Sequence, residues 1–424
     1  MRHVPPPTRL AHLTALLMSL SVTHGADWPQ WRGVQRDGHA QGEQALSTLS
    51  AELAPTWRTP VGSGLAAPVV ARGTLILLEE QGGREVAHAF KASDGSSLWV
   101  RPFAESFSDE WGVGPRSTPV MDGDRVYVQS CKGEFACLSL HDGQPVWRTD
   151  FSKDFGVVFM GTKVQEGAAV RRGHNGSALI DEDRIIIPVG STNGATLVCF
   201  NKLTGAMLWR SMNDESAYSS PVLATLAGVP QVVAFTADAL AGVNRSNGAV
   251  LWRVPIRSDA KRHALSPVVV GTDRVIVASH SFGMVCIRIE AVGSILRAST
   301  AWHNRSLKIN LSTPTLAGEH LYGFTTGQDY ACIRTENGVV QWSQPGFGKG
   351  VKTDYASTVC VGDRLLVLNE AGLLSLLSVD PSRFHSLGQA QVCGKTWTHP
   401  AYADGRLFVR DGKSLQCFNL LGQK

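Results

Sequence analysis

The chain has 424 residues, of which only 18% are charged, and its 43 glycines favour an all-β protein rich in hairpins. Its formal net charge is +4, and residues 1–26 carry two of these charges, which leaves about +2 for the remainder. So small a charge argues against nucleic acid as a partner, because binding a polyanion relies on many phosphate contacts.

Residues 1–26 have the plan of a secretory signal. Arg2 and Arg9 precede an apolar run at 10–22, and small residues follow it up to Ala26. We expect this segment to be cleaved and the protein to be periplasmic or secreted. The run is too short for a transmembrane segment, and no other stretch approaches the roughly 20 apolar residues that a span needs. Because the first cysteine is Cys131, we expect no lipid anchor.

An aromatic, turn-rich segment follows the signal. Residues 27–33 read DWPQWRG, and we interpret 27–53 as an extension or plug that packs against the outside or one end of the main domain. Residues 54–59 (APTWRT) then match the last strand of a repeat unit, although no first three strands come before them.

The main domain, residues 54–424, consists of a repeat whose clearest copy spans 116–147. Three short apolar runs, each stopped by a turn, precede a strand with a Trp, which predicts a four-stranded antiparallel meander. First-strand candidates begin at Leu65, Ser117, Ser177, Ser219, Ser266, Ser312, Ala356 and Thr398. Such sheets need neighbours of the same kind, so we predict an eight-bladed β-propeller.

The fourth strands support this count. We expect them to end at Trp99, Trp147, Trp209, Trp252, Trp302 and Trp342, with a degenerate one near 389–392 in the seventh unit. The eighth unit stops after its third strand, at 415–420. The orphan strand at Trp57 should therefore complete the eighth blade and close the ring, which removes two exposed sheet edges. Each Trp is expected to dock against the adjacent blade.

The longest insertion lies at 151–176, between the second and third units. Its length is typical of a lid or rim loop, and a solvated insertion is the alternative.

The eight cysteines do not follow the pattern of a disulfide framework. Five of them occupy the third strands of successive units, where a small apolar residue packs well: Cys137, Cys199, Cys286, Cys332 and Cys417. We predict that these are buried free thiols. Cys131 with Cys137, or Cys360 with Cys393, are the alternatives for a bridge. No Cys/His spacing of a metal site occurs.

The repeat resembles a known family. Its plan is Ser-x-Pro-Val, then Asp-Gly-x-Arg-Val-x-Val, a Gly turn and x-Gly-x-x-Leu-Trp, as in 122–128 (DGDRVYV), 201–209 (NKLTGAMLW) and 246–252 (SNGAVLW). This resembles the PQQ-type β-propeller repeat, over about residues 54–420. The family includes the pyrroloquinoline-quinone (PQQ) alcohol dehydrogenases and the BamB-like outer-membrane assembly propellers.

The two branches imply different functions. The dehydrogenases are longer and carry a disulfide between adjacent cysteines beside the cofactor, and this chain has no Cys-Cys pair. Its length and eight-blade plan are more similar to the BamB-like propellers, although it lacks their lipid-attachment Cys. For the dehydrogenases' calcium ligands and catalytic acid, only Glu166, Asn175 and Asp354 are candidates by residue type.

In a meandering propeller, every link into a first strand emerges at the same end of the ring, which we call the mouth. The residues that precede the first strands there are Trp111, Arg116, His174, Asn175, Tyr218, Arg262, His263, Lys308, Asn310, Lys352, Asp354, Tyr355, Lys395 and Trp397. Arginines and lysines from five units, with aromatic neighbours, could hold a flat polyanion such as PQQ. The alternative is an ordinary solvated rim.

From these patterns we expect an exported, monomeric binding or scaffold protein, with a BamB-like part in envelope protein assembly as its most specific form. Its partner would be an envelope protein or a small anionic ligand. The alternative is a PQQ-dependent dehydrogenase with calcium. In that case Arg116, Asn175, Tyr218, Arg262, Lys308, Asn310, Lys352, Lys395 and Trp397 would bind the cofactor, and Asp354 would take the substrate proton. A binder of extracellular polymer or sugar is a third possibility.

Overall fold

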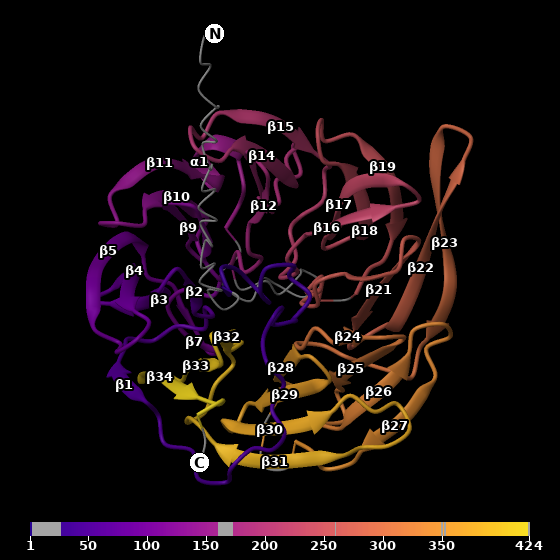
Figure 1. The fold of residues 1–424 in the computed structure, drawn as a ribbon. Coiled ribbons are helices and arrows are strands. Elements are labelled where there is room, and N and C mark those ends of the chain that lie inside the picture. Colours follow the sequence, from indigo (N-terminus) through magenta and orange to yellow (C-terminus); the bar gives the residue numbers. More distant parts are fainter. Residues whose placement is uncertain (2–26, 160–172, 259, 349–350, 352, 423–424) are drawn as a thin grey trace.

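The computed structural model describes Met1 and residues 27–159, 173–258, 260–348, 351 and 353–422. Eight four-stranded antiparallel sheets surround a central axis as blades (Figure 1). The predicted all-β, eight-bladed propeller is confirmed. The predicted signal segment, apart from Met1, lies outside the described residues.

Each blade runs from an innermost first strand to a peripheral fourth strand. The first strands are β2 (Val69–Ala71), β8 (Val120–Asp122), β12 (Leu179–Asp181), β16 (Val222–Leu226), β20 (Val268–Val270), β24 (Thr315–Ala317), β28 (Ala356–Val361) and β32 (Ala401–Ala403). The second strands are β3 (Thr74–Gln81), β9 (Arg125–Gln129), β13 (Arg184–Ile187), β17 (Val229–Phe235), β21 (Arg274–Ser279), β25 (His320–Phe324), β29 (Arg364–Asn369) and β33 (Arg406–Arg410).

The third strands are β4 (Arg84–Lys91), β10 (Glu134–Ser139), β14 (Leu197–Asn201), β18 (Ala239–Asn244), β22 (Gly283–Val292), β26 (Tyr330–Arg334), β30 (Leu373–Ser378) and β34 (Ser414–Asn419). The fourth strands are β5 (Ser97–Glu105), β11 (Pro145–Asp150), β15 (Met207–Ser211), β19 (Val250–Pro255), β23 (Ile295–Asn304), β27 (Val340–Gln344), β31 (Ser386–Gln391) and β1 (Trp57–Pro60). A short hairpin, β6 (Ser108–Asp109) and β7 (Gly112–Val113), and one helix, α1 (Phe151–Phe155), stand outside the blades.

The core lies between the blades, because side chains of a strand alternate between its two faces. On β3, Ile76 and Leu78 pack toward the second blade with Val126 and Val128. Leu75 and Leu77 belong instead to the cluster shared with the eighth blade. Both faces of each blade are thereby buried by neighbours.

The ring closes as predicted. β1 pairs antiparallel with β34, with Trp57 opposite Cys417, and supplies the fourth strand of the eighth blade. The orphan strand and the incomplete unit therefore form one sheet.

The Trp residues join neighbouring blades. The indole N–H of Trp57 donates to the carbonyl of Ala92 at 3.1 Å, and a Cβ on Gly95 would lie 2.5 Å from the same ring. Gly95 also has a φ of +72°, so glycine is required there twice over. The same bond recurs at Trp99, Trp147, Trp209, Trp302 and Trp342.

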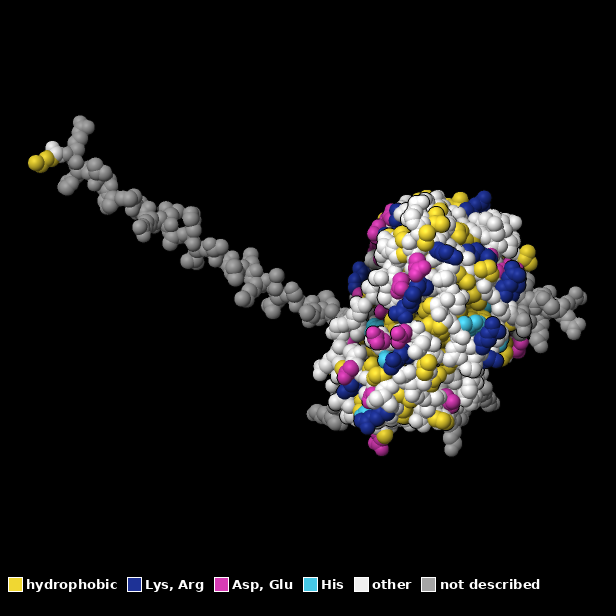
Figure 2. All heavy atoms as spheres, turned by 90° about the vertical axis from the view of Figure 1, so that its right-hand side faces the viewer, with side chains coloured by type: hydrophobic (Ala, Val, Ile, Leu, Met, Phe, Trp, Pro, Cys, Tyr) yellow, Lys and Arg dark blue, Asp and Glu magenta, His cyan; other side chains and the backbone are white. Residues whose placement is uncertain are grey.

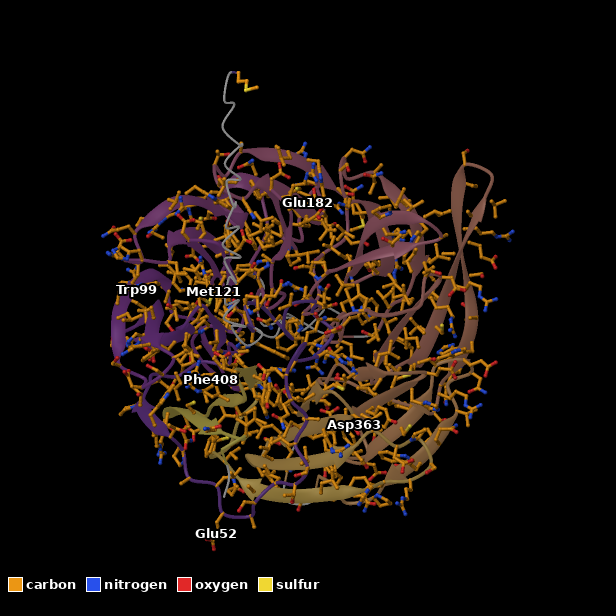
Figure 3. All side chains as sticks on the ribbon, in the orientation of Figure 1. Glu52, Trp99, Met121, Glu182, Asp363 and Phe408 are labelled. Carbon is orange, nitrogen blue, oxygen red and sulfur yellow. The ribbon has the colours of Figure 1, made fainter. Side chains whose placement is uncertain are left out.

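Two details of the fourth strands differ from expectation. The strands continue at least two residues past the Trp, because their backbone goes on pairing with the third strand; β5 extends to Glu105 (Figure 3, with Trp99 at the perimeter). Trp252 packs with the fifth blade as predicted, but its N–H donates to Gln231 of its own blade at 2.5 Å. In the next blade, β22 and β23 have ten residues each, so the turn of that hairpin lies further out.

The β22–β23 hairpin extends beyond the ring (Figure 1). On the side that carries it, basic and acidic side chains are interspersed with hydrophobic ones (Figure 2). The predicted insertion at 151–176 contains α1, and residues 160–172 lie outside the described part.

All eight cysteines are buried free thiols, so the predicted burial of the third-strand cysteines is confirmed. Among the described residues, no helix is both long and apolar enough to cross a membrane.

The segment after the signal packs against the inner strands. Trp28 exchanges backbone hydrogen bonds with Val70 of the first blade. Arg32 donates to the carbonyls of Thr313 and Pro314 in the sixth, at 2.6 and 3.2 Å. Arg36 donates to carbonyls of the third blade at 2.6 and 3.2 Å. Residues 28–40 therefore contact blades on different sides of the ring, near its axis.

The Ser and Thr residues that lie just before the first strands have a structural role. The Thr118 hydroxyl accepts from the N–H of Ala67, Ser177 accepts from Thr118, and Ser220 accepts from Ser177, at 2.9–3.4 Å. These bonds tie the first four blades together around the axis, at the end where the mouth lies.

Candidate functional site

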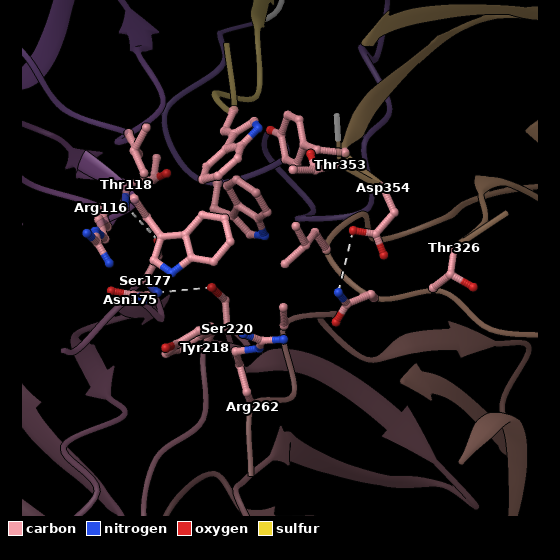
Figure 4. A pocket seen from close by; sticks show the side chains of 18 of the residues that line it. Arg116, Thr118, Asn175, Ser177, Tyr218, Ser220, Arg262, Thr326, Thr353 and Asp354 are labelled. Carbon is pink, nitrogen blue, oxygen red and sulfur yellow. Dashed lines mark hydrogen bonds between the residues drawn. The ribbon is translucent and has the colours of Figure 1, made fainter. Parts of the chain in front are cut away.

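A cavity of about 510 Å³ lies on the axis at the mouth (Figure 4). Links into several first strands form its wall, and Trp31 of the N-terminal segment contributes to it. The Trp31 indole is fixed by a 3.2 Å hydrogen bond to the Ser266 hydroxyl and by an edge contact with His399. The lining of the cavity thus includes Trp31, a residue that does not belong to the repeat.

Most of the predicted mouth residues meet in this cavity. Its lining includes Arg116, Asn175, Tyr218, Arg262, Asn310, Asp354 and Trp397, and also Trp111 and Tyr355. They come from seven links between blades, and the structure brings them together as one polar and aromatic group because all these links lie at the same end of the ring.

Of the predicted ring of arginines and lysines, only Arg116 and Arg262 line the cavity among the described residues. Lys308 is exposed and does not line the cavity. The Lys395 ammonium pairs with Glu370 at 3.1 Å and lies 5.0 Å from the Trp397 ring centre, beside the cavity. Lys352 lies outside the described residues. A link position fixes the end of the ring at which a residue lies, but not the direction of a long side chain.

Other lining residues were not anticipated from the sequence. Trp31 belongs to the segment we expected only to pack on the domain, and Thr118, Ser177 and Ser220 each lie two residues before a first strand. The repeated Ser/Thr at the start of each unit was the available signal. Gln328 and Thr326 come from the turn between β25 and β26, which carried no signal of a site.

Two ion pairs, Lys395 with Glu370 and Arg116 with Asp109, reduce the positive charge of the mouth. The Arg116 guanidinium bonds Asp109 at 2.6 Å, and both side chains are buried. Burial alone would lower the pKa of Arg116, but the hydrogen bond to Asp109 raises it. The guanidinium also lies over the Phe107 ring at 5.2 Å. Arg116 therefore carries a positive charge that Asp109 neutralises.

Asp354 adds a negative charge to the same cavity. Burial raises the pKa of this carboxyl, while a 3.5 Å hydrogen bond from Asn310 and the charges of His280 and Arg262 act in the opposite direction. Because Arg116 is paired to Asp109 and the charge of Asp354 offsets that of Arg262, the charges of the described lining residues nearly balance.

Several polar atoms of the lining are buried without a hydrogen-bond partner among the described residues. Two are donors, the Arg262 Nε and the Trp397 Nε1, and two are acceptors, the Oδ1 atoms of Asn175 and Asn310. Unpartnered buried groups are costly, about 1–3 kcal/mol each, so a ligand that supplies both acceptors and donors would be stabilised here.

A groove of about 560 Å³ adjoins the cavity. Both share Leu65, Trp111 and Trp397, and the two indole rings are 5.4 Å apart at a tilt of 42°. The groove follows the junction between the eighth and first blades and includes Arg58 and Lys413. The cavity and the groove together, which we call the mouth trough, form one continuous concave surface.

The lining does not fit PQQ well. A planar molecule with three carboxylates needs several uncompensated cations, and Arg116 is already paired while Asp354 would repel it. Of the residues that resemble the dehydrogenases' set by type, Glu166 lies outside the described part. Among the described residues, no cluster of three or more His, Cys, Asp or Glu side chains is placed to hold a metal ion.

Comparison with solved structures gives the same fold at low identity. BamB from Moraxella catarrhalis superposes with a TM-score of 0.56 and 15% identity, over 87% of this chain and 99% of that one. A quinohemoprotein alcohol dehydrogenase from Comamonas testosteroni gives 0.64 and 11%, over 94% and 81%. At such identities these likenesses show the fold and leave the function to other evidence.

Sequence comparison identifies the family. Outer membrane protein assembly factor BamB of Shewanella oneidensis is 22% identical over 396 residues, which cover 87% of this chain and 90% of that protein. The family model described as outer membrane protein assembly factor BamB matches residues 83–344. The chain therefore belongs to the BamB family of PQQ-type β-propellers.

Proposed function

We propose that this protein is a binding scaffold of the cell envelope that takes part in the assembly of outer-membrane proteins, exported and acting as a monomer. The role in assembly is supported by its relatives, which are described as outer membrane protein assembly factors. The mouth trough supports the mode of binding.

The observation that carries the proposal is the continuity of the cavity and the groove across Leu65, Trp111 and Trp397. A site that continues from the cavity into the groove, with aromatic walls and unpartnered donors and acceptors, suits an extended peptide. The peptide backbone would supply both hydrogen-bonding groups at regular spacing, and alternate side chains would pack on the indoles. A nearly neutral cavity favours such a ligand over a polyanion.

The test uses a peptide copied from a membrane-spanning strand of an outer-membrane β-barrel, with aromatic and polar residues alternating. Its binding to the purified chain is measured by calorimetry. Trp111→Ala and Trp397→Ala should each weaken binding roughly tenfold or more, since buried aromatic anchors dominate such sites. Val146→Ala, at an exposed position on β11, is the matched control and should bind like the wild type.

Equal binding by the wild type and both Trp variants would show that the peptide does not use the mouth trough. Failure of the wild type to bind the peptide at millimolar concentration would contradict the proposal itself.

The same lining favours a second candidate, a binder of extracellular polymer or sugar, because tryptophan rings with mixed donors and acceptors also suit a chain of hydroxyl groups. Competition between the peptide and an oligosaccharide for the mouth trough decides between the two candidates. An oligosaccharide that displaces the peptide and binds more tightly would favour the second candidate.

A further inference from the structure

A carboxylate, a histidine and a serine form a hydrogen-bonded row on the first blade, away from the mouth trough. Glu79 lies on β3, His88 on β4 and Ser97 on β5. The Nδ1 atom of His88 is 2.6 Å from the Oε1 atom of Glu79, and its Nε2 atom is 2.7 Å from the Ser97 hydroxyl oxygen. Three adjacent strands therefore place these groups in the order that activates a serine hydroxyl.

Glu79 is held as a carboxylate. It is fully buried, and it accepts hydrogen bonds from the Gly62 N–H and from the Gln81 amide at 2.8 Å. Burial raises the pKa of Glu79, but its bonds to His88 and Gly62 and the charge of Arg410 outweigh this and lower it. A fixed carboxylate at Nδ1 selects the tautomer in which His88 Nε2 is the acceptor.

The imidazole is held in place by packing. His88 is 8% exposed, and its ring stacks on Phe90 with 3.8 Å between centres. With Nδ1 bonded to Glu79 and one face on Phe90, the ring keeps Nε2 directed at Ser97. A base that is fixed in this way loses little entropy when it takes a proton.

Ser97, in contrast, is exposed. An exposed hydroxyl does not need a protein partner, so burial does not explain its bond to His88. β5 is the outermost strand of its sheet in the described part of the chain, so backbone N–H groups along its outer edge have no strand partner.

We propose that Ser97 is a nucleophile toward small activated esters, with His88 as its base and Glu79 as the positioning residue. The Ser97 hydroxyl proton passes to His88 Nε2 while the oxygen bonds to the ester carbonyl carbon. The bond from that carbon to the leaving oxygen then breaks, and the leaving group takes the proton from His88, which leaves an acylated Ser97. Water repeats the sequence and releases the acid.

The site lies outside the two cavities, so its substrate would approach from solvent. This favours a compact ester with a good leaving group, and the reaction does not depend on the proposed scaffold role.

The test is covalent labelling of the purified full chain with a fluorophosphonate. An activated serine attacks this reagent and forms a stable adduct with it. Peptide mass mapping should find the label at Ser97. The neighbouring Ser96, also exposed but bonded to Asp94, is the internal control and should react at least roughly tenfold more slowly. Ser97→Ala should abolish the label, and Ser96→Ala should leave it unchanged.

His88→Asn and Glu79→Gln examine the other two residues, and their melting curves show whether they fold. A folded His88→Asn should lose labelling at Ser97, and Glu79→Gln should retain a slower reaction. Release of nitrophenol from p-nitrophenyl acetate by the wild type but not by Ser97→Ala gives a second readout that needs no buried substitution. Labelling of Ser97 no faster than Ser96 in the wild type would overturn the proposal.

Discussion

Trp57 lies opposite Cys417 in the register of β1 and β34, so the beginning and the end of the propeller share one sheet. The same Trp reaches forward to the first blade, where its indole N–H donates to Ala92. One residue thus completes the eighth blade and docks it on the first, which makes the ring closure the point on which the fold depends.

Replacing Trp57 by Ala should destabilise the protein by about 3–5 kcal/mol, since it removes a buried indole from the closing junction. The side chain is only 8% exposed, whereas Trp111, the matched control, is 45% exposed. Urea unfolding followed by far-ultraviolet circular dichroism measures the difference. Trp111→Ala should change the midpoint only slightly, and an equal loss in both variants would contradict this role for the closure.

The buried Glu85 should make stability depend on pH. Burial raises the pKa of this carboxyl from 4.5 to about 8, with the charge of Glu134 acting in the same direction. Between these values the folded protein keeps a proton that the unfolded chain releases. The free energy of unfolding therefore falls as pH rises from about 4.5 to about 8.

Glu85→Gln should remove this slope, because the amide stays neutral at every pH. Urea midpoints at several pH values across the window, compared with those of the wild type, give the result. Glu105→Gln, at an exposed position, is the control and should keep the wild-type slope. A Glu85→Gln variant whose midpoint still falls as steeply would show that other groups cause it.

The cysteines should react slowly in the native protein. All eight are buried free thiols, and burial raises the pKa of those that line the blade interiors, for example to about 12 at Cys137 and Cys199. Because the thiolate is the reactive form, an aromatic disulfide reagent should modify few positions in native protein and all eight after unfolding. Rapid modification before unfolding, or disulfides found by mass spectrometry, would contradict the structure here.

PQQ should bind weakly. Arg116 is compensated by Asp109, and Asp354 faces the same cavity, so a trianion gains little there. Absorbance titration with PQQ and calcium should give a dissociation constant in the millimolar range or weaker, with no dye reduction by alcohols. Asp354→Asn, which removes the repelling charge, should strengthen PQQ binding. Micromolar binding by the wild type would instead favour the dehydrogenase.

The fold could be predicted from the sequence because its signals are local and repeated. Each turn glycine, each strand alternation and each Trp recurs eight-fold or nearly so, and the unpaired strand at Trp57 matches the unit that lacks one. The hydrogen-bond partner of each indole is less predictable than its packing. Trp252 packs with the fifth blade as predicted, but its N–H donates to Gln231 of its own blade, which the repeat pattern does not reveal.

The site was predicted only in part. Link positions placed Arg116, Asn175, Arg262 and Asp354 at one end of the ring, and they do line one cavity. The particular partner of Arg116 could not be predicted, because its pairing with Asp109 depends on the geometry of the β6–β7 hairpin. For the same reason, Lys395 was expected at the cavity but pairs with Glu370 beside it.

The most direct measurement of the scaffold proposal places a photo-crosslinking amino acid at position 111, on the mouth trough, or at position 146, on the outer strand β11. Both side chains are similarly exposed, 45% and 44%, so access alone does not distinguish them. Each variant is mixed with an outer-membrane β-barrel protein diluted from urea, and the crosslinked product is quantified. We predict several-fold more product from position 111. Equal yields from the two positions, or more from position 146, would contradict binding at the mouth.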